Sequence, residues 1–185
     1  MKLSLLIPVY GSAKILEESH KHLRKAAKLI TNNYEILFRY DCSPDNSYEV
    51  LKKIAKKDKK VRIFKNEKNM GLGFTLRNLF KDAKGDYLIY FDADAYKCFH
   101  LADIKKLIEE IKNYDAVIAS RYKESTKNVP WYRIYPSVIY FWVYRILFNL
   151  PIRDIGSGFV MFRRKAINSI NLKSNGFDIH LEIYA

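Results

Sequence analysis

Two aspartates, Asp92 and Asp94, directly follow a run of apolar and aromatic residues from Tyr87 to Phe91. Such a run is typical of a strand buried on both faces, and it stops where the carboxylates begin. Residues two apart in an extended chain point the same way, so both carboxylates project beyond the end of the predicted strand. Paired carboxylate oxygens suit Mg²⁺ or Mn²⁺ that also carries phosphate oxygens. The pair therefore predicts a site for a metal ion and a diphosphate, although Asp-x-Asp alone is more often a loop cap.

Alternating strands and helices are predicted on both sides of this pair. We expect strands at Leu3 to Pro8, Tyr34 to Tyr40, Val61 to Lys65, Tyr87 to Phe91 and Asp115 to Ala119. We expect helices at Ala13 to Ile30, after Pro44, at about Leu72 to Ala83 and at Asp103 to Lys112. The alternation predicts an α/β fold of three layers with a mainly parallel central sheet. Ligands bind such sheets beyond the carboxyl ends of the strands, which is where Asp92 and Asp94 are expected.

The length of 185 residues and the apolar content of 49% fit one globular domain, so we expect a single domain over residues 1–185. Cys42 and Cys98 are too few for a disulfide framework or a four-ligand zinc site. Met1 and Lys2 lead straight into the first predicted strand without a signal peptide. A cytosolic, reducing setting is therefore expected.

The formal net charge of +13 indicates an anionic partner, such as nucleic acid, anionic lipid or a phosphorylated substrate. From Arg121 to Lys165, nine basic and two acidic residues are mixed with many aromatic ones. Within this region, Ile134 to Leu150 is 17 residues long and contains Arg145, which makes it a poor membrane-spanning helix. The composition is typical of a helix at a membrane surface, and equally of an aromatic helix packed into the core.

Six motifs follow one another along the chain. They are Ile7-Pro-Val-Tyr10, Asp41-x-Ser-Pro-Asp45, Asn69-x-Gly-x-Gly73 with Gly85-Asp86 behind it, Asp92-Ala-Asp94, Ser120-Arg-Tyr122 and Asp154-x-x-Ser-Gly-Phe159. Any one of them is weak; the two glycines before residue 74, for example, allow close backbone approach, but a turn or a helix start explains them equally well. The ordered set resembles the family-two glycosyltransferases, and within these the dolichol-phosphate mannosyltransferases and the bacterial polyprenyl-phosphate glycosyltransferases.

The resemblance implies a GT-A (Rossmann-like) fold, a GDP- or UDP-linked sugar donor and a divalent cation, Mg²⁺ or Mn²⁺. It implies that residues 1–100 form the nucleotide-binding half and residues 101–185 the acceptor half of one catalytic domain. The sequence ends inside a predicted helix, so we expect the acceptor half to be incomplete at its C-terminus.

Carried over to this chain, the resemblance implies roles for individual residues. It implies that Pro8, Tyr10 and Asp41 hold the nucleoside. It also implies that Asp92 and Asp94 hold the ribose or sugar and the metal-bound diphosphate.

The same resemblance implies that Arg121, Arg133 and Ser137 bind the phosphate of the acceptor. Arg133 and Ser137 are four residues apart and would share one face of a helix. Asp154 matches an aspartate near the reacting centre and is our candidate base for an alcohol acceptor, although it could equally orient Arg153 or cap a turn. Glu182 matches a glutamate in the helix after Gly-Phe.

The sequence departs from the family pattern around the nucleotide. Gly11-Ser12 stands where Asn-Glu is usual, Tyr40 precedes Asp41 where the family has a second acidic residue, and Cys42 stands where glycine is usual. These changes leave open a degenerate member that acts as a non-catalytic basic module binding membrane or nucleic acid. No RNA-binding motif is present, so a nucleic-acid partner is disfavoured.

The leading hypothesis is an inverting hexosyltransferase that acts on polyprenyl (dolichol-type) phosphate, peripherally at the cytoplasmic face of the membrane. The alternative within the same class is a transferase that uses a saccharide acceptor in surface polysaccharide synthesis.

Overall fold

The computed structural model describes residues 1–97, 99, 101–120, 139, 141–143, 145–146, 152 and 154–184. The strands are β1 (Leu3–Val9), β2 (Tyr34–Tyr40), β3 (Val61–Lys65), β4 (Tyr87–Phe91), β5 (Ala116–Ile118) and β6 (Phe159–Arg163). The helices are α1 (Leu16–Ile30), α2 (Ser47–Lys57), α3 (Leu72–Asp82), α4 (Leu101–Glu110), α6 (Arg164–Ser169) and α7 (Ile179–Tyr184), and a 3₁₀ turn η1 (Ala95–Lys97) follows β4.

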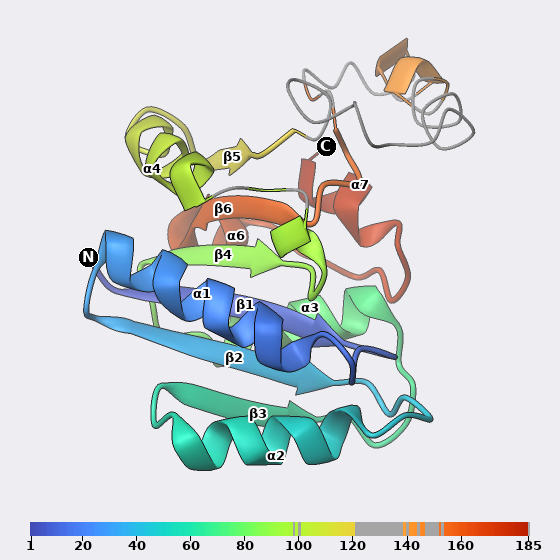
Figure 1. The fold of residues 1–185 in the computed structure, drawn as a ribbon. Helices are drawn as coiled ribbons and strands as arrows, with labels where there is room; N and C mark the ends of the chain where they lie inside the picture. The colour runs from blue at the N-terminus through green and yellow to red at the C-terminus, as the bar shows by residue number, and fades with distance from the viewer. Residues whose placement is uncertain are drawn as a thin grey trace.

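The six strands form one sheet in the order β3-β2-β1-β4-β6-β5 (Figure 1). The pairs β1–β2, β2–β3 and β1–β4 are parallel, whereas β6 runs antiparallel to both β4 and β5. After β3 the chain crosses back to place β4 on the free side of β1. The carboxyl ends of β1 and β4 thus flank the point where the strand order reverses, which is where open α/β sheets bind ligands.

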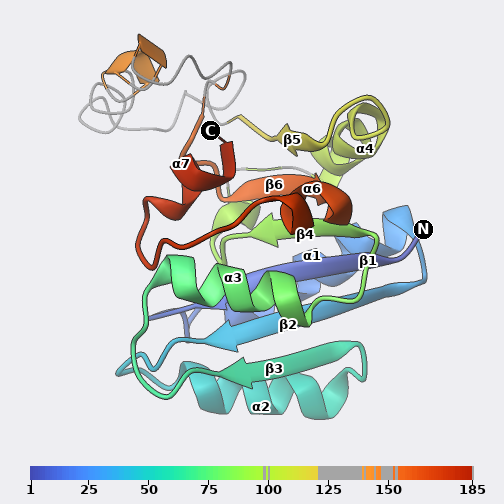
Figure 2. The same ribbon diagram turned by 180° about the vertical axis from the view of Figure 1, so that it is seen from behind.

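Helices cover both faces of the sheet and give it two separate cores (Figures 1 and 2). Residues of α1, α2 and α4 pack on one face, among them Leu23, Leu51 and Ile104. Residues of α3, α6 and α7 pack on the other. Because successive strand residues alternate between faces, Ile89 joins the first core and Tyr90 the second. The predicted three-layer arrangement is confirmed.

Strand β6 was not anticipated from the sequence. Its residues Phe159 to Phe162 are almost fully buried, so both of its faces are covered, and it lies between β4 and the edge strand β5. In the register, Phe159 lies opposite Phe91, the last residue of β4. The antiparallel strand therefore carries the residues just before it, from Asp154 to Gly158, to the end of β4 where Asp92 begins.

Candidate active site

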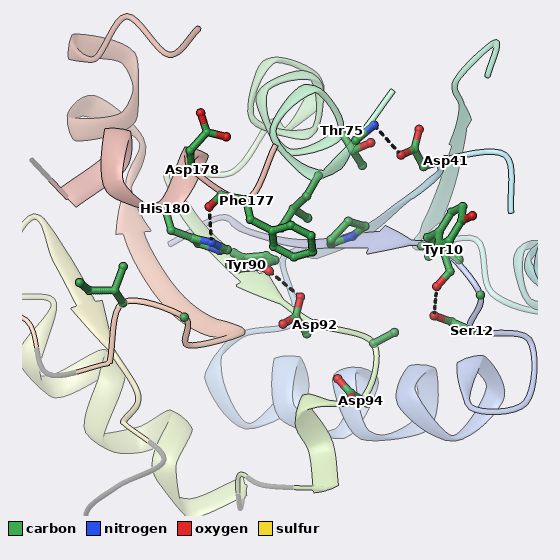
Figure 3. Close-up of a pocket in the computed structure, with 18 of the residues that line it drawn as sticks. Tyr10, Ser12, Asp41, Thr75, Tyr90, Asp92, Asp94, Phe177, Asp178 and His180 are labelled. Carbon is green, nitrogen blue, oxygen red and sulfur yellow. Dashed lines mark hydrogen bonds between the residues drawn. The ribbon is translucent and has the colours of Figure 1, made fainter. Parts of the chain in front are cut away.

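A cleft of about 1070 Å³ opens at the carboxyl ends of β1, β2 and β4. Six residues singled out from the sequence line it: Pro8, Tyr10, Asp41, Asp92, Asp94 and Asp154. Its other side is lined by residues just before and within α7, which are Phe177, Asp178, His180 and Leu181 (Figure 3). The fold therefore gathers into one cavity side chains that lie more than a hundred residues apart in the sequence.

The cleft is acidic although the chain as a whole is basic. Five aspartates line it, and the described lining residues include no lysine or arginine: Asp41, Asp92, Asp94, Asp154 and Asp178. Carboxylates that share a cavity repel one another, and they would also repel a diphosphate. A bound divalent cation would offset this repulsion, so the charge pattern suits a metal–nucleotide complex better than a free anion.

Asp92 is held in place from several directions. Its backbone N–H donates to the Gly158 carbonyl oxygen over 2.7 Å, and its Oδ1 accepts a hydrogen bond of 2.5 Å from the Tyr90 hydroxyl. A Cβ atom on Gly158 would overlap the Asp92 carboxylate, so this position has no room for a side chain. The glycine of the Ser-Gly-Phe motif is therefore explained by the close approach of Asp92.

Asp94 lies two residues further on and is exposed. The backbone turns sharply between the two aspartates, with Ala95 donating to the Asp92 carbonyl and Lys97 to the Asp94 carbonyl. Asp92 is therefore half-buried and fixed, whereas Asp94 is an exposed residue of the cleft lining (Figure 3).

Asp41, at the end of β2, is 5% exposed and binds the chain's own loop. Its carboxylate accepts hydrogen bonds from the backbone N–H groups of Met70 and Gly71 over 2.8 and 2.9 Å. The Asn66 side-chain amide donates to it as well, over 2.7 Å. Cys42, the next residue, has a φ of 51°, a left-handed conformation that explains why glycine suits this position.

Gly71 and Gly73, at the start of α3, are required because the backbone of a second segment lies against them. Cβ atoms on Gly71 and Gly73 would overlap the backbone carbonyl oxygens of Asn175 and Ser174, respectively. The Asn175 oxygen accepts hydrogen bonds from the N–H groups of Gly73 (2.8 Å) and Phe74 (3.4 Å). We call residues 172–182 the return segment, because they bring the end of the chain back onto the start of α3.

Glu182 holds the return segment together. Its carboxylate accepts hydrogen bonds of 2.9 Å from the backbone N–H groups of Lys173 and Ser174. Arg77 of α3 donates to the Asn175 side chain and to the Leu172 carbonyl oxygen. Glu182 is the glutamate that the family resemblance singled out. In the structure it binds the backbone of the segment that contacts α3.

The loop after β1 is ordered by Asp45. This carboxylate accepts hydrogen bonds from the Ala13 N–H over 2.9 Å and from the Ser43 hydroxyl over 2.6 Å. Burial acts to raise the pKa of Asp45, but these hydrogen bonds and those from Ser47 outweigh it and lower the pKa to about 2. The ring of Tyr10, before this loop, is 54% exposed at the cleft.

Asp154 is 3% exposed and lies at the inner wall of the cleft. Burial and the nearby charges of Asp154 and Asp92 raise the pKa of the Tyr184 hydroxyl above its ordinary range. Two carboxylates and a phenol therefore share one enclosed region. The predicted acceptor residues Arg121, Arg133 and Ser137, like Arg153, lie outside the described residues.

The chain also matches known proteins. Glycosyl transferase family 2 matches residues 4–170, which is most of the sequence. The chain is a member of glycosyl transferase family 2. A dolichol-phosphate mannosyltransferase from Pyrococcus furiosus is 37% identical over 99% of this chain. This member of the family spans about half of that relative, 52% of its length.

Solved structures with low sequence identity to this chain share its fold. A glucosyl-3-phosphoglycerate synthase from Mycobacterium tuberculosis, solved with Mn²⁺, UDP-glucose and phosphoglyceric acid, superposes with a TM-score of 0.70 at 14% identity. That match covers 98% of this chain and 63% of the synthase. A mannosyltransferase from Pyrobaculum calidifontis, solved with GDP-Man and Mn²⁺, gives a TM-score of 0.64 at 12% identity, covering 98% of this chain and 51% of the other. The expected GT-A fold is confirmed.

Three residues in or near the cleft are not among the predicted site residues. Tyr90 belongs to the apolar strand and binds Asp92, His180 packs on the Tyr90 ring, and Asn175 contacts α3 through its backbone carbonyl. Only Tyr90 could have been found, since its position two residues before Asp92 places both side chains on one face of the strand.

Proposed function

We propose that this chain is the catalytic part of an inverting glycosyltransferase that moves a hexose from a GDP- or UDP-linked sugar to a polyprenyl phosphate. The observation that carries the proposal is the acidic cleft, in which Asp41, Asp92 and Asp94 meet at the carboxyl edge of the sheet in a family-2 chain. The name of the Pyrococcus relative supports the lipid-phosphate acceptor. The two solved structures with a nucleotide sugar and Mn²⁺ support the donor class and the cation.

The residues at the end of β4 fit Mg²⁺ or Mn²⁺. The described part of the chain has no group of three or more His, Cys, Asp or Glu side chains placed to hold a metal ion. Mg²⁺ at nucleotide sites takes one or two carboxylates and completes its shell with phosphate oxygens and water, which Asp94 and Asp92 would allow. When bound, the cation would stabilise the negative charge that develops on the leaving diphosphate.

The nucleoside would lie at the ends of β1 and β2. Pro8 and Tyr10 line this side of the cleft, and the exposed Tyr10 ring offers a face on which a base or ribose can pack. Asp41 would accept hydrogen bonds from the nucleoside while it also orders the loop before α3. These residues bind and orient the donor, so that its anomeric carbon faces the acceptor side of the cleft.

The acceptor would approach from the side of Asp154. A phosphate monoester has a second pKa of about 6, so a polyprenyl phosphate is already largely ionised at neutral pH and can attack directly. Asp154 would then orient the acceptor side, and it would act as a base only for an alcohol acceptor. Arg121, Arg133 and Ser137 are our candidates for binding the phosphate.

The helical residues near 142 suit a membrane surface. Trp142 and Ile146 are 54% and 76% exposed, and the Arg145 guanidinium lies 5.9 Å from the centre of the Trp142 ring. Exposed apolar side chains beside a basic one favour the boundary between lipid headgroups and acyl chains, so we propose that the enzyme binds a membrane surface peripherally. The cytoplasmic leaflet is the side that we expect. Among the described residues, no helix has the length and apolar character needed to cross a bilayer.

Transfer of labelled sugar into extractable lipid tests the proposal. Purified protein is incubated with polyprenyl phosphate, Mg²⁺ or Mn²⁺, and a panel of GDP- and UDP-linked sugars. We expect label in the lipid with one donor, only in the presence of metal, and a loss of at least about 100-fold in Asp94→Ala. Asp115→Ala, at an aspartate 80% exposed next to β5, is the matched control and should keep full activity. Transfer to a saccharide but not to lipid would mean that the acceptor is a saccharide. No transfer from any donor would reject the proposal.

A further inference from the structure

Tyr90 is a buried phenol bonded to a carboxylate of the cleft. It is 1% exposed, and its hydroxyl donates to Asp92 Oδ1 over 2.5 Å. Tyr90 packs on the face of the sheet that α3 and α7 cover, and Asp92 follows two residues later, directly after the end of β4. A buried hydroxyl needs a hydrogen-bond partner, and here the partner is a residue of the proposed donor site.

The Tyr90 ring is itself held by α7. His180 lies against it, with ring centroids 5.7 Å apart and planes inclined by 35° (Figure 3). His180 is 8% exposed, and its Nδ1 lies 3.2 Å from the Phe177 carbonyl oxygen. Both ends of the Tyr90 side chain are therefore constrained, the ring by packing and the hydroxyl by Asp92.

The Tyr90 hydroxyl is the donor in this hydrogen bond, because an ionised carboxylate can only accept. Hydrogen bonds to charged groups are the stronger class. One oxygen of Asp92 thus has a protein donor two residues away in the chain.

We propose that Tyr90 is a positioning residue for the donor site: its hydroxyl fixes the orientation in which the Asp92 carboxylate meets the metal–nucleotide complex. The inference rests on the function proposed above. Groups that bind a metal or a nucleotide work best when a second protein group holds them in the productive orientation before the ligand arrives. Gly158 provides the opposing side of this arrangement, because a side chain there would push Asp92 away. Asp94, which is exposed, has no such support from Tyr90.

Calorimetric titration of UDP and of GDP, each with and without Mn²⁺, compares wild type with Tyr90→Phe. The substitution keeps the ring on His180 and removes only the hydroxyl. We expect the nucleotide that wild type binds to bind about tenfold more weakly in the presence of Mn²⁺, which is the usual effect of losing one hydrogen bond to a charged group. Tyr87→Phe, at the other end of β4 and outside the cleft lining, is the matched control and should bind as wild type does.

A double-mutant cycle with Asp92→Ala separates positioning from general stability. If Tyr90 acts through Asp92, Tyr90→Phe weakens binding in the wild-type background and has no further effect when Asp92 is already alanine. A fall in melting temperature with unchanged nucleotide affinity would overturn the inference, as would an equal loss in both backgrounds. Equal binding by wild type and Tyr90→Phe overturns this inference alone, whereas wild type that binds neither nucleotide overturns the proposed function as well.

Discussion

Two regions from different parts of the chain both bind the start of α3. The strand-end region, residues 8–10, 41–45 and 92–94, comes from consecutive strand–helix units, and its Asp41 accepts hydrogen bonds from the N–H groups of Met70 and Gly71. The return segment comes about a hundred residues after the start of α3. Its Asn175 carbonyl oxygen accepts hydrogen bonds from the N–H groups of Gly73 and Phe74. The first N–H groups of a helix lack partners within the helix, and here each region supplies part of the cap.

This difference shows how the two halves of the cleft are coupled. The strand-end region contributes charged side chains, of which Asp41, Asp45 and Asp92 accept hydrogen bonds from loops or from a strand neighbour. At the start of α3, the return segment contributes backbone carbonyl groups, which only glycines at 71 and 73 can admit. A change in the return segment should therefore alter the loop that Asp41 binds, although the return segment and this loop share no sequence motif.

The largest effect is expected for Gly73→Ala, which would break the contact between α3 and the return segment. Inside a helix, alanine is normally better than glycine by about 1 kcal/mol. Here the added Cβ overlaps the Ser174 carbonyl oxygen, and overpacking of this kind costs about 1–3 kcal/mol. We expect the free energy of unfolding in urea to fall by about 2 kcal/mol.

Gly11→Ala is the matched control for this change. Its Cβ would meet no atom within 4 Å, so only the strain of its φ of 62° remains, about 1 kcal/mol. A gain in stability for Gly73→Ala would mean that the return segment does not contact α3 closely.

Glu182→Gln should weaken the return segment without adding bulk. The neutral amide is a poorer acceptor for the Lys173 and Ser174 N–H groups, and we expect a loss of about 1 kcal/mol. Hydrogen exchange should show faster exchange at these two amides, while the Met70 amide, which Asp41 holds, changes less. Glu109→Gln on the exposed face of α4 is the control. Unchanged protection at residues 173 and 174 would contradict the role of Glu182.

Substitutions at Cys42 test whether backbone strain lowers the stability of the strand-end region. Its φ of 51° is unfavourable for a residue with a Cβ, by about 1 kcal/mol or slightly more. Cys42→Gly and Cys42→Ala both lose the contact between Cys42 Sγ and the Asn66 carbonyl. Only Cys42→Gly also relieves the strain, although it makes the unfolded chain more flexible. We expect the melting temperature of the glycine variant to exceed that of the alanine variant; the reverse order would rule out strain at this position.

The smallest effect is expected in the acid range, at Asp45. Its folded pKa of about 2 lies below its ordinary value of 3.8, so the ionised form is favoured in the folded state. The stabilisation is complete above about pH 4 and is lost as the pH falls towards 2. Melting curves from pH 2 to 6 should therefore show a shallower acid loss in Asp45→Asn than in wild type. Parallel curves would mean that the loop after β1 does not depend on this carboxylate.

Local patterns in the sequence predicted much of the strand-end region. The strands at Tyr34, Val61 and Tyr87 have the predicted bounds, because continuous apolar runs that end in polar residues identify buried parallel strands. The alternation of strands and helices placed Asp92 and Asp94 at the ligand-binding edge for the same reason. The roles of these residues stay predictions until nucleotide binding is measured.

No comparable sequence pattern predicted the position of the return segment or of β6. A run of apolar residues from Phe159 to Phe162 indicates burial, but not that the strand enters between β4 and β5 in the antiparallel direction. The contacts of Asn175 with Gly73 and Phe74 use its backbone carbonyl, which every residue has, so residue type carries no information about them.

The sequence by itself therefore determined the family, the strand–helix order and which carboxylates meet at the edge of the sheet, since these follow from short-range periodicity and ordered motifs. Only the tertiary structure decided that Tyr90 holds Asp92, that Gly158 makes room for it and that the return segment caps α3. The physical reason is that these contacts depend on the close packing of segments distant in the chain, where a single Cβ atom decides whether two backbones can meet.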